Sequence, residues 1–209
     1  MKTISIGTQS SAAALAQAFA DALAAEISWT ADENGCVKKD GISVYFKFAT
    51  SGTTNAKLTI SNGYKDSDGG VTCAFSASNT YKLYLLETVG GSIAVGISPA
   101  TGALTLGILI VRNAAGTYVG ITSSSTYAQT LRGIESATRT VSLATTSTAG
   151  VSTSIVRMPD IWGATMFNDL YYVISCPFQS TDRVFYIGGK NYRSVGANSG
   201  YMFFALPEE

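Results

Sequence analysis

From Gly41 onward, apolar side chains recur at every second residue in a series of short runs. In ISVYFKF, residues 42–48, one face of an extended chain carries Ile42, Val44, Phe46 and Phe48. This period is typical of half-buried β-strands, because successive side chains of a strand point to opposite faces. The loop around Gly52 separates this run from KLTIS, which marks a hairpin. The chain is therefore predicted to be mainly β.

Further runs of the same kind continue towards the C-terminus. About seven strands are expected by Ile121, at the spacing typical of a sandwich or a barrel. A polar stretch, TSSSTYAQT, then interrupts the pattern, and the runs that follow it are richer in Tyr and Phe. We expect residues 1–122 to form an N-terminal α-helix and an antiparallel β-sandwich or barrel. Residues 123–209 are expected to form a second, smaller β unit that ends in a C-terminal hairpin.

The segment that precedes the alternation has the pattern of a helix. An apolar ridge recurs every four residues at Leu15, Phe19, Leu23 and Ile27. Ser10 or Ser11 can cap the helix, and Ala, which favours helix, fills most other positions. The helix either covers its own sheet or packs an Ala-rich face on a neighbouring subunit.

We expect Phe19 to lie in the core of its own chain. The alanines expected to touch a neighbouring subunit are Ala12, Ala16 and Ala20. On this hypothesis Ala16→Glu disrupts assembly at little cost to the fold.

The charge balance argues against a nucleic-acid partner. The 209 residues include 14 basic and 14 acidic side chains, so the formal net charge is zero, and only 13% of residues are charged. Nucleic-acid binders usually carry a basic stripe, and no window of this chain has one. The densest charges, in ADENGCVKKDG, alternate in sign and predict a solvated loop. A neutral surface of Ser, Thr, Asn and Gly also suits contact between copies, because it removes their mutual repulsion.

Two apolar stretches resemble membrane signals without fitting them. SAAALAQAFADALAA follows Lys2 as a secretory signal would, but Asp21 interrupts it, so we predict no signal peptide. Residues 88–111 carry no charge and are long enough to span a bilayer. Their several glycines and Pro99 suit two strands with a connection better than a lipid-exposed helix. No membrane insertion is expected.

The cysteines and the absence of histidine limit the chemistry. Cys36, Cys73 and Cys176 are far apart and form no Cys-x-x-Cys pair, so a zinc site or thioredoxin-like motif is excluded on spacing. We expect Cys73 and Cys176, inside apolar runs, to be small buried hydrophobic residues. Without histidine, Ser-His-Asp and Cys-His nucleophiles and His-bearing metal sites are excluded. We assign no catalytic residue, cofactor or metal ion, and predict that the protein is not an enzyme.

Two sets of carboxylates are candidate sites. A glycosidase pair needs no histidine, and its candidates are Asp160, Asp169 and Asp182. Each lies among turn residues, where Asp commonly bonds the backbone. KDSDGG, residues 65–70, resembles the start of a calcium loop through Asp66 and Asp68, but it lacks the downstream Glu. A solvated hairpin turn is the preferred interpretation, with a weak calcium site as the alternative.

The Gly-Gly-Lys of VFYIGGKNYRSVG, residues 184–196, raises the question of a phosphate-binding loop. In a P-loop another Gly stands five residues before the Gly of the Gly-Lys pair, and a helix follows the Lys. Here Val184 takes the place of that Gly, and an alternating run follows the Lys. We predict a hairpin in which Gly188 and Gly189 adopt the positive φ angles of a type I′ turn.

Aromatic residues of the second unit offer one binding hypothesis. The set that could line a carbohydrate surface is Trp162, Tyr171, Tyr172, Tyr192 and Tyr201. Core filling and strand pairing explain the same residues without a ligand, and this structural interpretation is preferred.

Three stretches carry a family resemblance: YKLYLLETVGGSIAVGI (81–97), LTLGILIVRNAAGTYVGI (104–121) and FYIGGKNYRSVGANSGYMFFAL (185–206). They resemble small structural proteins of tailed bacteriophages and prophages. The resemblance implies a virion component, made in a bacterial cytoplasm, whose partners are copies of itself and other virion proteins. The leading hypothesis is thus a non-enzymatic, self-assembling component of a tail, baseplate, neck or head decoration. The alternative is a carbohydrate- or receptor-binding β module, itself compatible with a place on a virion and with a host surface glycan as partner.

Overall fold

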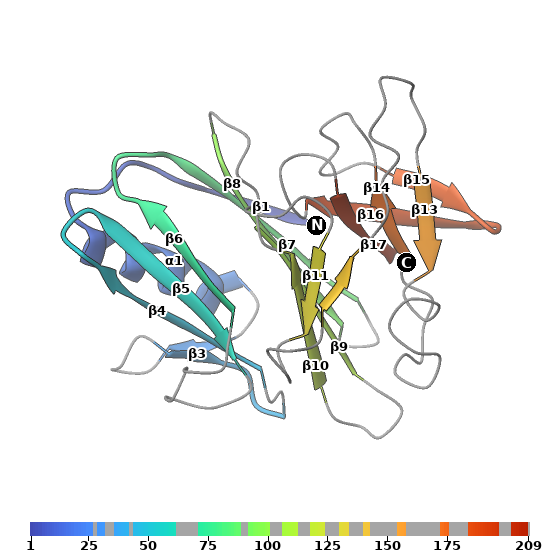
Figure 1. The fold of residues 1–209 in the computed structure, drawn as a ribbon, viewed down its shortest axis with the longest axis horizontal. Coiled ribbons are helices and arrows are strands. Elements are labelled where there is room, and N and C mark those ends of the chain that lie inside the picture. Colours follow the sequence, from blue (N-terminus) through green and yellow to red (C-terminus); the bar gives the residue numbers. More distant parts are fainter. Residues whose placement is uncertain are drawn as a thin grey trace.

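The computed structural model describes most of the first half of the chain and shorter stretches of the second. The described residues are 1–26, 29–31, 36–41, 44–61, 71–88, 92–100, 106–112, 118–123, 130–133, 140–142, 154–157, 172–175, 184–196 and 202–208. Within these ranges the protein has one α-helix, α1 (Ala12–Glu26), and three antiparallel β-sheets, which lie side by side in Figure 1. The prediction of a mainly β chain with one N-terminal helix is confirmed.

The central sheet has the strand order β1-β7-β8-β9-β10-β11-β12. Its strands are β1 (Lys2–Ile6), β7 (Tyr81–Glu87), β8 (Ile93–Pro99), β9 (Leu106–Arg112), β10 (Tyr118–Ser123), β11 (Thr130–Gly133) and β12 (Thr140–Ser142). The pairing of β10 with β11 crosses the expected domain boundary between residues 122 and 123. That boundary itself stays a prediction.

The N-terminal sheet has the order β2-β3-β4-β5-β6. Its strands are β2 (Thr30–Ala31), β3 (Cys36–Lys38), β4 (Tyr45–Ser51), β5 (Asn55–Ser61) and β6 (Val71–Ser76). The predicted hairpin around Gly52 joins β4 and β5, with Ser51 paired to Asn55 and a φ of 70° at Gly52. The alternation also holds, because Val44, Phe46 and Phe48 are all buried. Ile42 lies outside the described residues.

The C-terminal sheet has the order β13-β14-β17-β16-β15. Its strands are β13 (Ser154–Arg157), β14 (Tyr172–Ser175), β15 (Val184–Ile187), β16 (Lys190–Gly196) and β17 (Met202–Pro207). β16 contacts β7, β8 and β9, so this sheet packs against the central sheet. Its strands lie within residues 123–209, the range expected to form a second β unit, but β11 and β12 of the same range belong to the central sheet. All three sheets are open rows within the described residues, which favours the sandwich over the barrel.

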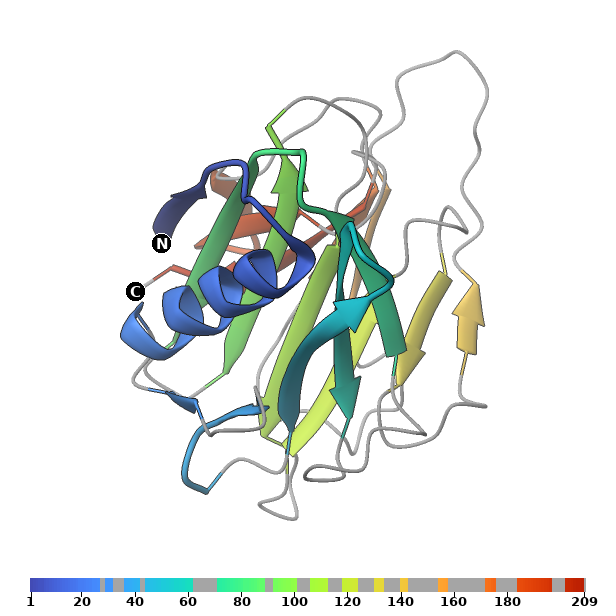
Figure 2. The same cartoon turned by 90° about the vertical axis from the view of Figure 1, so that its left-hand side faces the viewer.

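The main hydrophobic core lies between the N-terminal and central sheets, and α1 packs along it (Figure 2). Ser11 caps the helix, since its Oγ accepts a hydrogen bond of 3.2 Å from the amide of Ala14. The predicted ridge residues Leu15, Phe19 and Leu23 are fully buried. Ile27 lies outside the described residues.

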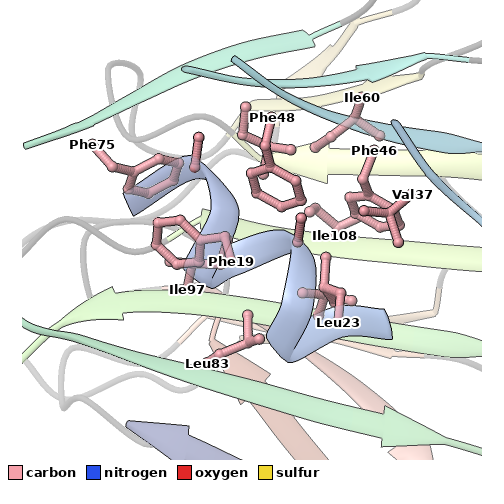
Figure 3. Close-up of a cluster of buried hydrophobic side chains, with 14 of the residues drawn as sticks. Phe19, Leu23, Val37, Phe46, Phe48, Ile60, Phe75, Leu83, Ile97 and Ile108 are labelled. Carbon is pink, nitrogen blue, oxygen red and sulfur yellow. The ribbon is translucent and has the colours of Figure 1, made fainter. Parts of the chain in front are cut away.

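Phe19 joins the layers of this core (Figure 3). Its ring stacks on Phe48 of β4 at 5.7 Å between centroids, and tilts against Phe75 of β6 at 5.3 Å and Tyr81 of β7 at 5.4 Å. Aromatic pairs at these distances stabilise a core beyond the burial of their area. The expectation that Phe19 is an intrachain core residue is confirmed.

The expectation that the alanines of α1 touch a neighbouring subunit is wrong. Ala12, Ala16 and Ala20 are 2%, 7% and 2% exposed, and Ala16 and Ala20 belong to the main core of their own chain. Small side chains at these positions let the helix approach its own sheets closely. The solvent-facing side of α1 instead carries Gln17 and Asp21, joined by a hydrogen bond of 2.7 Å.

β8 is covered on both faces, because the central sheet is the middle layer. Ile93, Val95 and Ile97 point into the main core, and Ala94, on the opposite face, is also fully buried. A strand buried on both faces has a continuous apolar sequence, which accounts for SIAVGI. Together with its partner β9, it confirms that the uncharged stretch at residues 88–111 contains two strands.

The sequence pattern did not predict four of the strands: β1, β2, β3 and β11. β3 lies inside ADENGCVKKDG, which was predicted to be a solvated loop, and its Val37 is fully buried. These strands are short or polar, so partners far away in the sequence decide their conformation. β1, for example, is held by antiparallel pairing with β7.

Candidate functional site

The Gly-Gly-Lys segment forms a tight hairpin. Ile187 of β15 pairs with Lys190 of β16, and the two residues between them, Gly188 and Gly189, have φ angles of 57° and 86°. Positive φ at both central residues is the signature of the type I′ turn. The strand β16, and no helix, follows Lys190. The hairpin prediction is confirmed, and these residues form no P-loop.

One side of this hairpin exposes apolar side chains to solvent. Val184 is 46% exposed and Tyr186 is 76% exposed, and they are the large hydrophobic residues exposed in the described part of the chain. Both project from the same face of β15, and we call them the β15 surface. Across the hairpin they face Arg193 and Asn191 of β16. Removal of apolar surface from water is favourable. Two exposed apolar side chains side by side therefore mark a candidate contact site.

The opposite face of the hairpin is anchored. Phe185 and Ile187 pack against a small cluster made by Tyr192 of β16 and Ala205 of β17. Tyr192 is only 3% exposed. It is therefore a core residue of the C-terminal sheet, and the hypothesis that it lines a carbohydrate surface is wrong.

An ion pair ties the strands behind the β15 surface. Nε of Arg193 donates a hydrogen bond of 2.7 Å to Oε1 of Glu208, and Nη2 of Arg193 contacts the same oxygen. The two charges neutralise each other beside Val184, which lies opposite Arg193. The charge of Arg193, directly across from Val184, is thus compensated by Glu208.

For the other residues predicted to form sites, the structure describes no side chain. The candidates Trp162, Tyr171, Tyr201, Asp66, Asp68, Asp160, Asp169, Asp182 and Cys176 lie outside the described residues. Tyr172 is in β14, Cys36 in β3 and Cys73 in β6, but their side chains are not described. The calcium, glycosidase and aromatic-surface hypotheses at these positions stay untested.

Tyr81 is the described residue with a clearly displaced pKa. Burial raises the pKa of its phenol above the ordinary 10.0, and hydrogen bonds with Asn79 and Ser76 lower it in part. Its Oη donates 2.9 Å to the carbonyl of Ser76, and its ring meets Phe75 edge-on at 5.6 Å. These contacts make Tyr81 a core residue that stays protonated.

Comparisons with known proteins provide no relative that bears on the role of the β15 surface. No family model, curated protein or solved structure matches the chain. Across the ranges that the structure describes, no three His, Cys, Asp or Glu side chains are placed to hold a metal ion. The same ranges include no helix with the length and apolarity needed to cross a membrane.

The sequence analysis missed the β15 surface. The alternation already placed Val184 and Tyr186 on one face and Phe185 and Ile187 on the other. It did not reveal that β15 ends its sheet, because strand order depends on pairing between distant segments. That order decides which of the two faces remains uncovered.

Proposed function

We propose that this chain is a non-enzymatic structural protein that works as repeated copies in a phage or phage-like particle. The observation that carries the proposal is the β15 surface, where Val184 and Tyr186 remain exposed on an uncharged edge strand. All of this hairpin except Val184 lies in the stretch 185–206, which resembles phage structural proteins. A component of a tail, baseplate, neck or head decoration needs such contact surfaces, because identical copies must bind one another or their neighbours.

The charge balance supports a protein that packs against itself. Equal numbers of acidic and basic side chains and a charged fraction of 13% leave little repulsion between copies. The packing of Phe185 and Ile187 against the C-terminal sheet suits the same role, because a contact surface that is already held in place binds at lower entropic cost. Assembly in this proposal buries neutral surface and does not rely on steering by charge.

Three measurements test this proposal. Multi-angle light scattering on the purified chain should report an oligomer, and electron microscopy should show a regular assembly. Immunogold labelling of particles released by cells that carry the gene should place the chain on the virion. A chain that stays monomeric over the micromolar range and is absent from all particles would contradict the proposal.

A carbohydrate- or receptor-binding module is the second candidate, and Tyr186 favours it. An aromatic ring that is 76% exposed can stack on a sugar, and the exposed Asn191 directly opposite supplies an amide for its hydroxyls. In this alternative, Tyr186→Ala abolishes binding to a bacterial glycan array and leaves the oligomeric state unchanged. Absence of binding by the wild-type chain across the array would remove the candidate.

A further inference from the structure

We propose that β15 pairs antiparallel with β15 of a second copy, with Val184 opposite the partner's Tyr186. This inference rests on the proposed function as a multi-copy protein, and it names the contact and its register. The paired strands would join two C-terminal sheets into one continuous sheet across a two-fold axis at Phe185. Such an interface is isologous, because each copy contributes the same strand.

The direction of the backbone groups in β15 follows from its neighbours. The amide of Glu208 donates 2.9 Å to the carbonyl of Asn191, so Asn191 directs its backbone groups towards β17. Along a strand these groups alternate sides, so Tyr192 directs its own towards β15. Pro207, which has no N–H to donate, stands opposite Tyr192 and agrees with this phase.

The backbone groups at the free edge of β15 are therefore those of the two exposed residues. Phe185, paired with Tyr192, and Ile187, at the turn, bond to β16. Val184 and Tyr186 direct their N–H and C=O groups away from the hairpin. No other strand of the described sheet lies beyond β15. Among the described strands, none pairs with the outward backbone groups of these two residues, whose apolar side chains are also exposed.

These groups are complementary to those of an identical strand. With Val184 opposite the partner's Tyr186, all four outward groups of each strand find a partner across the two-fold axis. The register also places each large ring beside a smaller β-branched side chain on the same face, a favourable cross-strand pair. Residues 184–187 carry no charge, so two copies meet without repulsion.

β15 lacks the protection found on two other edge strands, β1 and β2. β1, at one end of the central sheet, carries an exposed Lys2, and β2, at one end of the N-terminal sheet, has only two residues. Charge and shortness are common ways to prevent unwanted strand pairing. β15 has neither a charge nor a proline, and its register with β16 is continuous. An open and uncharged edge strand of this kind favours pairing with the same strand of a second copy.

A charge on the β15 surface should prevent the pairing. Sedimentation of the full chain should show a dimer or larger oligomer, and Tyr186→Lys should raise its dissociation constant at least about tenfold. The matched control is Thr3→Lys, which adds the same charge to an exposed position of the edge strand β1. This control should leave the dissociation constant unchanged. Val184→Pro should weaken association as well, because it removes an outward N–H while the bonds to β16 remain.

Cysteine cross-linking tests the register. In the proposed pairing Phe185 lies opposite the partner's Phe185, with about 4.5 Å between Cα atoms. Phe185→Cys should therefore form a disulfide-linked dimer under mild oxidation, since that distance lies in the range of disulfides. Val184→Cys places the two sulfur-bearing residues about 8 Å apart at Cα, which is too far. The wild-type chain, with Cys36, Cys73 and Cys176, controls for native thiols.

The outcomes separate this inference from the proposed function. Oligomers that are unmoved by Tyr186→Lys, or cross-linking by Val184→Cys in place of Phe185→Cys, would overturn the β15 pairing and leave the particle proposal standing. A β15-linked dimer that is absent from particles would confirm the pairing and contradict the particle proposal. A wild-type chain that is monomeric and loses only glycan binding in Tyr186→Lys would overturn the pairing in favour of the glycan candidate.

Discussion

The main core around α1 and the hairpin β15–β16 share one sequence pattern, but its side chains are buried in the core and partly exposed in the hairpin. In β4 the alternating residues Phe46 and Phe48 are covered by α1 and the central sheet. In β15 the alternating residues Val184 and Tyr186 remain exposed, although the period and the residue types are similar. The comparison teaches that alternation assigns residues to faces, whereas packing of distant elements decides which faces are covered.

The two regions also differ in what anchors them. Phe19 holds three strands from two sheets together, so the core depends on one side chain reaching several layers. The hairpin depends on its turn and on one small cluster beneath it. Substitutions in the core should therefore cost stability, and substitutions on the β15 surface should cost association.

Removal of the Phe19 ring should have the largest effect on stability. Phe19→Ala deletes a fully buried aromatic side chain and leaves a cavity between two sheets, so we expect a loss of about 3–5 kcal/mol. Urea denaturation followed by circular dichroism measures this loss. Tyr186→Ala is the matched comparison and should change stability by less than about 0.5 kcal/mol. Equal losses for the two variants would contradict the distinction between the regions.

Ala16→Glu should destabilise the monomer by roughly 2–4 kcal/mol, because it forces a larger and charged side chain into the core. Ala16 is only 7% exposed and faces its own sheets. Thermal melting of dilute protein measures the effect. The control Ala13→Glu changes an exposed residue of the same helix and should leave the melting temperature nearly unchanged. An unaltered melting temperature in Ala16→Glu would revive the neighbouring-subunit hypothesis for this helix face.

Gly189→Ala should cost about 1 kcal/mol, because L-residues with a side chain rarely adopt its φ of 86°. A Cβ atom there would meet nothing within 4 Å, so the cost is conformational and not steric. Gly7→Ala is the control, since its Cβ would also be unobstructed and its φ is not positive. Equal stability of the two variants would argue against a type I′ turn.

The buried phenol of Tyr81 should make stability fall at high pH. Its folded-state pKa is raised above 10.0, chiefly by burial, so the unfolded chain releases this proton first as the pH rises. The folded state then binds more protons than the unfolded state, and the free energy of unfolding decreases above about pH 10. Denaturation between pH 8 and 11 should show a shallower decline for Tyr81→Phe. A decline of the same slope in this variant would contradict the assignment.

The sequence predicted the local features of this fold well. The ridge of α1, the hairpin at Gly52 and the turn at Gly188 each depend on neighbouring residues, whose period or φ preference is visible directly. It failed where a contact depends on distant segments. The burial of Ala16, the pairing of β1 with β7 and the exposure of Tyr186 all depend on how three sheets meet, and no local pattern encodes that arrangement.

Amide hydrogen exchange of β15 at low and high protein concentration tests the central claim most directly, because it reports each backbone N–H separately. In the dilute chain, the amides of Phe185 and Ile187 should be protected by β16, and those of Val184 and Tyr186 should exchange rapidly. At high concentration the amides of Val184 and Tyr186 should become protected, and Tyr186→Lys should abolish that change. Association of the chain without any new protection at these two amides would contradict the account.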